Sequence, residues 1–334
     1  MWEEPAIERR TFIGVIAWGL VAAPLAAEAQ QAGKMPRVGM LYVGTLQGAN
    51  RCDEAFRQGL AAVGYAEGKS IALEIRAAEG KSERLSELAA ELVRLKVDVI
   101  FAPSTLAAQS AKQATRTLPV VFATAADPIG SGLIEGLGRP GGNLTGLSLI
   151  AGPEIGGKYL ELLREAVPRV SRMAVVRNPD TSAHAPVVKE IEGAARTLGV
   201  EIHPMSVRKA DEFPGAFTAM VQKRVGAFIM LADPLFLSHR VEIAELAAKH
   251  RLPSMYGLRE HVEVGGLMAY GVDLRHNCGR AATFVNKILK GANPATLPVE
   301  QPTKFEVVIN GKTAKALGLT IPPLLLLRAG EVIQ

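Results

Sequence analysis

The chain has 334 residues, of which 48% are hydrophobic and 21% are charged, and its formal net charge is +5. This length and composition are ordinary for a soluble protein with two globular lobes, and they exclude disorder as the main state. Lys and Arg are interspersed with acidic residues and only 5% of the residues are aromatic, so the sequence lacks the basic stripe and the stacking platform of a nucleic-acid-binding protein. No nucleic-acid partner is expected.

The N-terminus has the features of an export signal. Two adjacent arginines at positions 9 and 10 precede an apolar run over 12–27, and the Ala-Glu-Ala sequence at 27–29 has the small-x-small form of a cleavage site. The run is short and contains a proline, which favours a cleaved signal peptide over 1–29 rather than a permanent membrane anchor. The arginine pair also resembles a twin-arginine signal, although the start is unusually acidic, so the export route stays open. A periplasmic mature protein is expected.

The sequence has two cysteines, Cys52 and Cys278. Neither lies at the predicted cleavage point, so lipid attachment is not expected there. In an oxidising compartment the two could pair, but the sequence favours two isolated buried thiols. Their spacing from other ligand-type residues predicts no metal site.

From residue 37 on, short β-branched runs alternate with amphipathic helical stretches, which predicts a parallel sheet covered by helices. The first expected strands span 38–43, 70–76, 97–102 and 119–123, and the helices between them span 54–63, 82–95 and 106–116. The same order then recurs, with strands over 172–176, 201–204, 227–231 and 253–256 and helices over 187–198, 213–223 and 240–250. The sequence therefore predicts an α/β protein with two doubly wound, Rossmann-like lobes.

Two segments with flanking glycines, 141–147 and 265–271, each predict a short strand. They fit hinge strands that join the lobes, because hinge residues must absorb changes in φ and ψ. The alternative is that they are ordinary Gly-rich turns. The expected N-terminal lobe is 36–145 plus about 272–300, and the expected C-terminal lobe is 146–270 plus about 301–330.

Candidate binding residues lie in the loops that follow the expected strands, because ligands of parallel sheets bind beyond the carboxyl ends of the strands. They are Thr45, Ser104, Thr105 and Asp127 in the first lobe and Asn178, Ser182, Asp233, Tyr256 and Arg259 in the second. Their polar groups suit hydrogen bonds to a small carboxylate or amine, although such residues also cap helices and turns. Asp127 and Asp233 are each followed by Pro, and they could bracket an amino group from the two lobes.

The sequence lacks four catalytic motifs that have a diagnostic spacing. It lacks a G-x-S-x-G elbow, a P-loop, an H-E-x-x-H pair and a G-x-G-x-x-G after the first expected strand. We expect a binding protein without catalytic residues, cofactor or metal. Two alternatives stay open, an enzyme on the same two-lobed framework and a periplasmic ligand sensor.

Six strings spread over the mature chain form a specific set when they are taken together. They are FRQGL at 56–60, GYAEGK at 64–69, RPGGNLTG at 139–146, DPLF at 233–236, QPTKFEVVIN at 301–310 and TAKALGLTIP at 313–322. This set resembles the substrate-binding proteins of ABC transporters whose characterised relatives bind tryptophan or tyrosine.

The resemblance implies a type I periplasmic-binding fold with three crossings between the lobes and a ligand in the cleft between them. It also implies a small-molecule ligand, a membrane permease as partner, membrane contact only through that permease, and a monomer or weak dimer. It does not fix the ligand. Aromatic residues that could stack on an aromatic amino acid are Tyr42, Phe122, Phe236, Tyr256 and Tyr270, most of which could equally be core.

We predict that export removes residues 1–29, because the small-x-small pattern ends at Ala29 and the composition changes at Gln30. N-terminal sequencing of the protein recovered from the periplasm should therefore begin at Gln30. A periplasmic protein that begins at Met1 would contradict this prediction.

Overall fold

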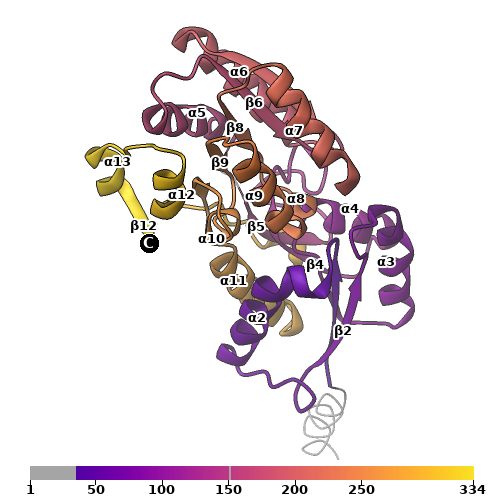
Figure 1. The fold of residues 1–334 in the computed structure, drawn as a ribbon. Coiled ribbons are helices and arrows are strands. Elements are labelled where there is room, and N and C mark those ends of the chain that lie inside the picture. The colour runs from indigo at the N-terminus through magenta and orange to yellow at the C-terminus, as the bar shows by residue number, and fades with distance from the viewer. Residues whose placement is uncertain (1–34, 150–151) are drawn as a thin grey trace, which may run out of the picture. The chain divides into compact units, whose positions relative to one another are not determined.

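The computed structural model describes residues 35–149 and 152–334, and the predicted signal peptide lies outside them. The described strands form two sheets of mostly parallel strands covered by helices (Figure 1). One sheet has five strands in the order β2-β1-β3-β4-β5, and the other has seven in the order β12-β11-β10-β9-β8-β6-β7. The prediction of a two-lobed α/β fold is confirmed. The five-stranded sheet and the helices packed on it are called the first lobe. The seven-stranded sheet and its helices are called the second lobe.

The first lobe is built on a fully parallel sheet. Its strands are β1 (Arg37–Tyr42), β2 (Ala72–Ala77), β3 (Val99–Phe101), β4 (Val120–Ala125) and β5 (Leu144–Ser148), and its covering helices include α2 (Leu46–Ala62), η1 (Ser82–Arg84), α3 (Leu85–Arg94) and α4 (Thr105–Ala114). The central strands are buried almost throughout, as expected where helices cover both faces of a parallel sheet.

A helix from much later in the chain completes the first lobe. Helix α11 (Leu274–Leu289) lies along α2 and packs against β4 and β5 (Figure 1). Its buried face carries Cys278, Ala281, Phe284 and Val285, which join the same core as Phe56 of α2.

The second lobe contains the larger sheet. Its strands are β6 (Arg172–Arg177), β7 (Glu201–Ser206), β8 (Ala227–Met230), β9 (Ser254–Tyr256), β10 (Met268–Gly271), β11 (Glu306–Asn310) and β12 (Ala329–Ile333). Its helical segments are α5 (Ile155–Ala166), α6 (His184–Leu198), η2 (Ala210–Glu212), α7 (Phe213–Gln222), α8 (Pro234–Ser238), α9 (Arg240–Lys249), α10 (Glu260–Glu263), α12 (Gly311–Ala316) and α13 (Pro323–Arg328). The short helix η3 (Pro294–Thr296) lies near β5 of the first sheet instead. All its strand pairs are parallel except β10 with β11.

Both short strands predicted between glycines are regular members of the sheets. Strand β5 pairs with β4, and β10 pairs with β9 and β11. Gly146 in β5 has a φ of +147°, and a Cβ there would lie 1.9 Å from the carbonyl oxygen of Phe122. The first of these strands therefore requires glycine where it runs close to β4.

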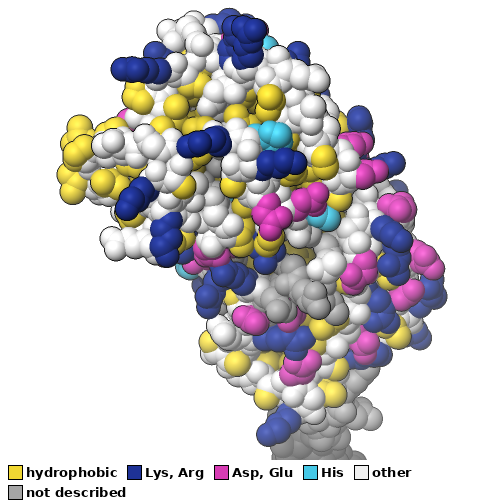
Figure 2. All heavy atoms as spheres, in the orientation of Figure 1, with side chains coloured by type: hydrophobic (Ala, Val, Ile, Leu, Met, Phe, Trp, Pro, Cys, Tyr) yellow, Lys and Arg dark blue, Asp and Glu magenta, His cyan; other side chains and the backbone are white. Residues whose placement is uncertain are grey.

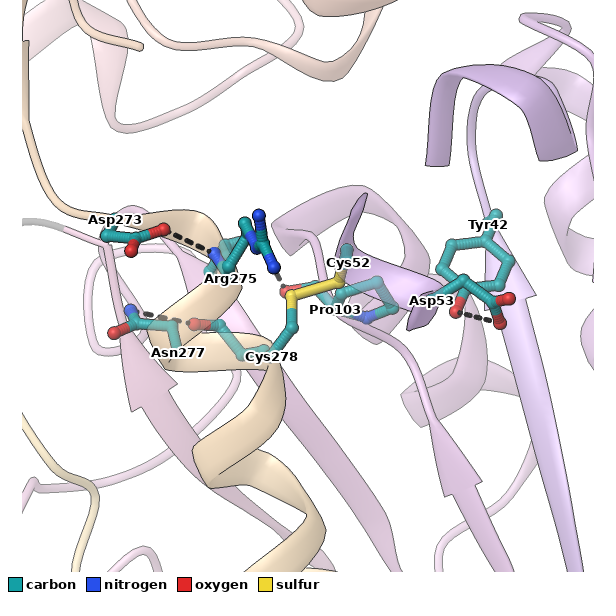
Figure 3. The surroundings of a disulfide bond; sticks show 10 residues. Tyr42, Cys52, Asp53, Pro103, Asp273, Arg275, Asn277 and Cys278 are labelled. Carbon is teal, nitrogen blue, oxygen red and sulfur yellow. Dashed lines mark hydrogen bonds between the residues drawn. A yellow bond between two sulfur atoms is a disulfide. The ribbon is translucent and has the colours of Figure 1, made fainter. Parts of the chain in front are cut away.

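The two cysteines form a disulfide between α2 and α11 (Figure 3). Cys52 and Cys278 are 226 positions apart in sequence, and their Cα atoms are 5.3 Å apart. The sequence-based preference for two separate thiols is wrong. It failed because the pairing depends on how α11 packs along α2, a tertiary contact that no local pattern shows.

The surface in view in Figure 2 has Lys and Arg interspersed with Asp and Glu. A hydrophobic area gathers where Figure 1 places α13, and the most exposed apolar side chains of that helix are Leu324 and Leu327. Among the described residues, no helix is both long enough and apolar enough to cross a bilayer.

We predict that removing the disulfide with the double change Cys52→Ala and Cys278→Ala lowers the free energy of unfolding by about 2–5 kcal/mol, since the bond closes a long loop in the unfolded chain. Urea denaturation of the oxidised protein and the variant measures the difference. Reductant should shift the midpoint of the wild type and leave that of the variant unchanged; a wild-type midpoint that is insensitive to reductant would contradict the prediction.

Candidate ligand-binding site

A cavity of about 390 Å³ lies where strand ends of the two sheets meet. Its first-lobe wall comes from the residues after β1, β3, β4 and β5 and from α2 and α11, and its second-lobe wall comes from the residues after β6, β8 and β9. This is the carboxyl edge of both sheets, where ligands of parallel α/β sheets bind. The volume lies at the lower end of the range for small-molecule sites, roughly 300–1,000 Å³.

Part of the cavity wall is apolar. It is formed by Tyr42, Pro103, Leu149, Leu258 and Leu274, together with the disulfide. Tyr42 is held in place by its hydroxyl, which donates to Oδ1 of Asp53 at 3.3 Å (Figure 3). Such a wall suits a hydrophobic or aromatic part of a ligand.

The start of α4 gives the cavity a group of hydrogen-bond donors. Ser104 is the N-cap and its Oγ accepts from the N–H of Ala107 at 3.4 Å, while Oγ1 of Thr105 accepts from the N–H of Ala126 at 3.1 Å. A hydroxyl that accepts can still donate its own hydrogen, and the first turn of a helix has N–H groups without intrahelical partners. This corner therefore suits an anionic group such as a carboxylate.

Asp233 also lines the cavity, but its carboxylate is engaged within the protein. It is 2% exposed; Oδ1 accepts from the N–H of Leu235 at 2.9 Å, and Oδ2 accepts from the hydroxyl of Thr181 at 2.7 Å. The contact with Leu235 is that of the N-cap of α8, and the contact with Thr181 ties this cap to the loop after β6. The structure thus gives Asp233 the capping role that the sequence left as one alternative.

Glu260, which sequence reasoning did not select, is a buried acid in the cavity wall. It is 5% exposed, and its Oε2 has no hydrogen-bond partner within the part of the chain that the structure describes. Burial raises the pKa of Glu260 and nearby Glu263 adds to this, while the backbone N–H of Glu260 and the charges of Arg51 and Arg259 act in the opposite direction. The nearest sequence signal for Glu260 is its position in the loop after β9, where the rule for strand ends selects the neighbouring residue Arg259.

Two residues chosen from that loop and strand lie outside the main cavity. The guanidinium of Arg259 pairs with Glu263 at 3.2 Å and also with Glu331 of β12. Tyr256 is fully buried in the core of the second lobe, where its ring stacks on His261 with centroids 4.6 Å apart. Burial lowers the pKa of His261 to about 4, so this imidazole is neutral at pH 7.

The other chosen residues lie around the cavity or form turns. Thr45 follows Gly44, which lines the cavity, whereas Ser182 is exposed and follows the lining residue Thr181. Oδ1 of Asn178 accepts from the N–H of Asp180 at 3.0 Å.

Asp127 stabilises a turn and lies in a different place from Asp233. Its Oδ1 accepts from the N–H of Gly130 at 2.8 Å, and it lines a second cavity of about 210 Å³. Asp233 lines the main cavity instead, so the two aspartates line different cavities, and their bracketing of an amino group stays a prediction.

Among the aromatic candidates, Tyr42 contributes to the main cavity. Phe122, Phe236 and Tyr256 are fully buried core residues. Tyr270 stacks on Phe305, with centroids 5.5 Å apart. Residues 35–149 and 152–334 contain no group of three His, Cys, Asp or Glu side chains that could hold a metal ion.

Comparison with known proteins agrees with the fold. A family model described as ABC transporter substrate binding protein matches residues 47–333. The chain belongs to this family. The resemblance found in the six strings is confirmed, and so is the type I periplasmic-binding fold that it implied.

Several relatives of this substrate-binding protein have known structures or ligands. A "Tyrosine-binding protein" from Clostridioides difficile (strain R20291) is 24% identical over 286 residues, which cover 86% of this chain and 82% of that protein. The structure of an ABC domain from Streptococcus pneumonia in complex with L-Trp is 28% identical with a TM-score of 0.84, and the match covers 90% of this chain and all of that one. A conserved domain protein from Vibrio cholerae matches with the same identity, TM-score and coverage.

Replacing Asp233 by Ala is expected to lower the free energy of unfolding by about 1–3 kcal/mol, because the change removes the N-cap of α8 and leaves the Thr181 hydroxyl without its acceptor. Urea denaturation measures this loss. The matched control is Asp233→Asn, whose amide oxygen can still accept from Leu235 and should retain part of the stability. An alanine variant as stable as the wild type would show that these two contacts do not hold the loop.

Proposed function

We propose that this chain is exported to the periplasm, binds a free aromatic amino acid such as tryptophan or tyrosine in the main cavity, and presents it to the permease of an ABC importer. It acts by binding and closure, without catalysis. The observation that carries the proposal is the cavity itself, which combines an apolar wall with hydrogen-bond donors at the start of α4 and acids in the opposite lobe.

This arrangement suits an amino acid group by group. The carboxylate fits the Ser104 and Thr105 corner, where hydroxyls and helix N–H groups can donate. The side chain fits the apolar wall beside Tyr42, Leu258 and Leu274. A ligand of this size with a dissociation constant near 1 μM gains about 8 kcal/mol on binding.

Relatives support the aromatic class, since one is a tyrosine-binding protein and another has been solved in complex with L-Trp. Solved binding proteins described with allitol or D-allose share the fold at 12% and 16% identity. The apolar wall favours an aromatic side chain over a polyol, because a sugar would leave hydroxyl groups against surfaces that cannot accept hydrogen bonds.

The disulfide supports an extracytoplasmic location, because such bonds persist in oxidising compartments and are rare in the cytosol. We further propose that the lobes, 36–145 plus about 272–300 and 146–270 plus about 301–330, close around the ligand and that the permease recognises the closed form.

Calorimetric titration of the mature protein with aromatic amino acids, leucine and D-allose tests the proposal. We expect saturable binding of L-tryptophan or L-tyrosine and a higher melting temperature, since ligand at 100 times its dissociation constant stabilises by about 2.7 kcal/mol. Absence of binding by every aromatic amino acid at millimolar concentration would refute the proposed ligand class.

A pair of variants shows whether binding occurs in this cavity. Leu274→Gln places a polar group in the apolar wall and should weaken binding about tenfold or more. Leu326→Gln makes the same change on the exposed face of α13 and should leave the affinity unaltered. Equal affinities for the two variants would place the ligand elsewhere.

A further inference from the structure

Glu260 differs from the other acids of the cavity wall in what its carboxylate contacts. Asp233 is equally buried, but each of its oxygens accepts a hydrogen bond within the protein. Glu54 is exposed, so water can solvate it. Glu260 is nearly inaccessible, yet its Oε2 has no partner in the described structure. A buried polar group of this kind calls for a specific explanation.

The neighbouring arginines do not supply the missing partner, because they are engaged by other acids. Arg51 of α2 pairs with Glu263, and Arg259 pairs with Glu263, Glu306 and Glu331. Glu306 also pairs with Lys304 at 2.8 Å. Arg240 also lines the cavity, but its guanidinium donates to the carbonyl oxygen of Leu237 at 3.1 Å. Among the described residues, the negative charge of Glu260 is therefore in no ion pair of its own.

That charge lies in the wall of the cavity, opposite the donors of α4. The cavity therefore has an anion-binding corner in the first lobe and an unpaired buried anion in the second. A ligand that carries both a carboxylate and an ammonium would complement both. Among the groups that such a ligand can offer, a protonated amine matches Glu260 best, since it has several donors and a positive charge.

We infer that Glu260 receives the ammonium group of the ligand and thereby restricts the cavity to ligands with a cationic amine. This assignment rests on the proposed function and names the ammonium as the ligand group that Glu260 binds. It also replaces Asp233, to which the sequence gave that role. In the free protein, burial makes ionisation of Glu260 costly and its Oε2 has no hydrogen-bond partner among the described residues, so the side chain that binds the amine lowers the stability of the ligand-free protein.

The test compares Glu260→Gln with Glu87→Gln, which makes the same chemical change on an exposed acid of α3 that does not line the cavity. The probes are the proteinogenic amino acids and des-amino analogues that keep the carboxylate, with indole-3-propionate and 3-(4-hydroxyphenyl)propionate for the aromatic pair. Dissociation constants come from calorimetry, and melting temperatures are measured without ligand.

We expect wild-type protein to bind the amino acid at least tenfold more tightly than its des-amino analogue. Glu260→Gln should weaken binding of the amino acid by about 10- to 100-fold, the size of a lost hydrogen bond to a charged group, and leave the analogue nearly unchanged. Glu87→Gln should change neither by more than about threefold. The ligand-free Glu260→Gln variant should melt at or above the wild-type temperature, because the substitution replaces a buried acid whose Oε2 has no hydrogen-bond partner by a neutral amide.

A Glu260→Gln variant that keeps the wild-type affinity for aromatic amino acids would overturn the inference and leave the proposed function intact. The same holds if that variant melts well below the wild type and loses amino acid and analogue equally, since Glu260 would then be structural. Binding of a different amine that depends on Glu260, without binding of aromatic amino acids, would overturn the proposed ligand class and uphold the inference. Absence of binding by every amine would overturn both.

Discussion

Parallel pairing of the strands is the constraint on which the rest of this structure depends. A parallel strand cannot return through a tight turn, so each strand ends in a loop that leads to a helix at the same edge of the sheet. In the first sheet this edge carries the loops after β1, β3 and β4, and in the second it carries those after β6, β8 and β9. The lining of one small cavity is thereby collected from segments that are distant in sequence, and the start of α4 is one of them.

Local patterns predicted the repeated elements well, because β-branched runs and Gly or Pro stops act over a few residues. The helix expected at 187–198 became α6 from His184 to Leu198, and the strand at 119–123 became β4 from Val120 to Ala125. Helix α2 begins at Leu46, eight positions earlier than expected, because its first two turns show no apolar stripe in the sequence. Helix α11 and strands β11 and β12 were not predicted as elements, and the disulfide that depends on α11 was missed with them.

The candidate site was predictable as a set of loops but not at the level of single side chains. The rule for strand ends selected Ser104 and Thr105, which line the cavity. The same rule selected Tyr256 and Arg259, whereas the structure brings Glu260 to the wall and Tyr256 into the core. In a short segment that leads into α10, adjacent residues point in different directions, and only the packed structure decides which one faces the cavity. The ion pairs that occupy Arg51 and Arg259 are also long-range, so the sequence could not show that Glu260 is left unpaired.

The bond between Cys52 and Cys278 has a consequence for how the molecule responds to proteolysis. It encloses the whole chain from β2 to β10, including most of the second lobe. A protease that cuts any loop within that span produces two pieces that stay covalently attached at the wall of the cavity. Helices α2 and α11, which come from opposite ends of the enclosed segment, remain joined after such a cut. Cleavage of such a loop would then open the polypeptide without separating α2 from α11 in the first lobe.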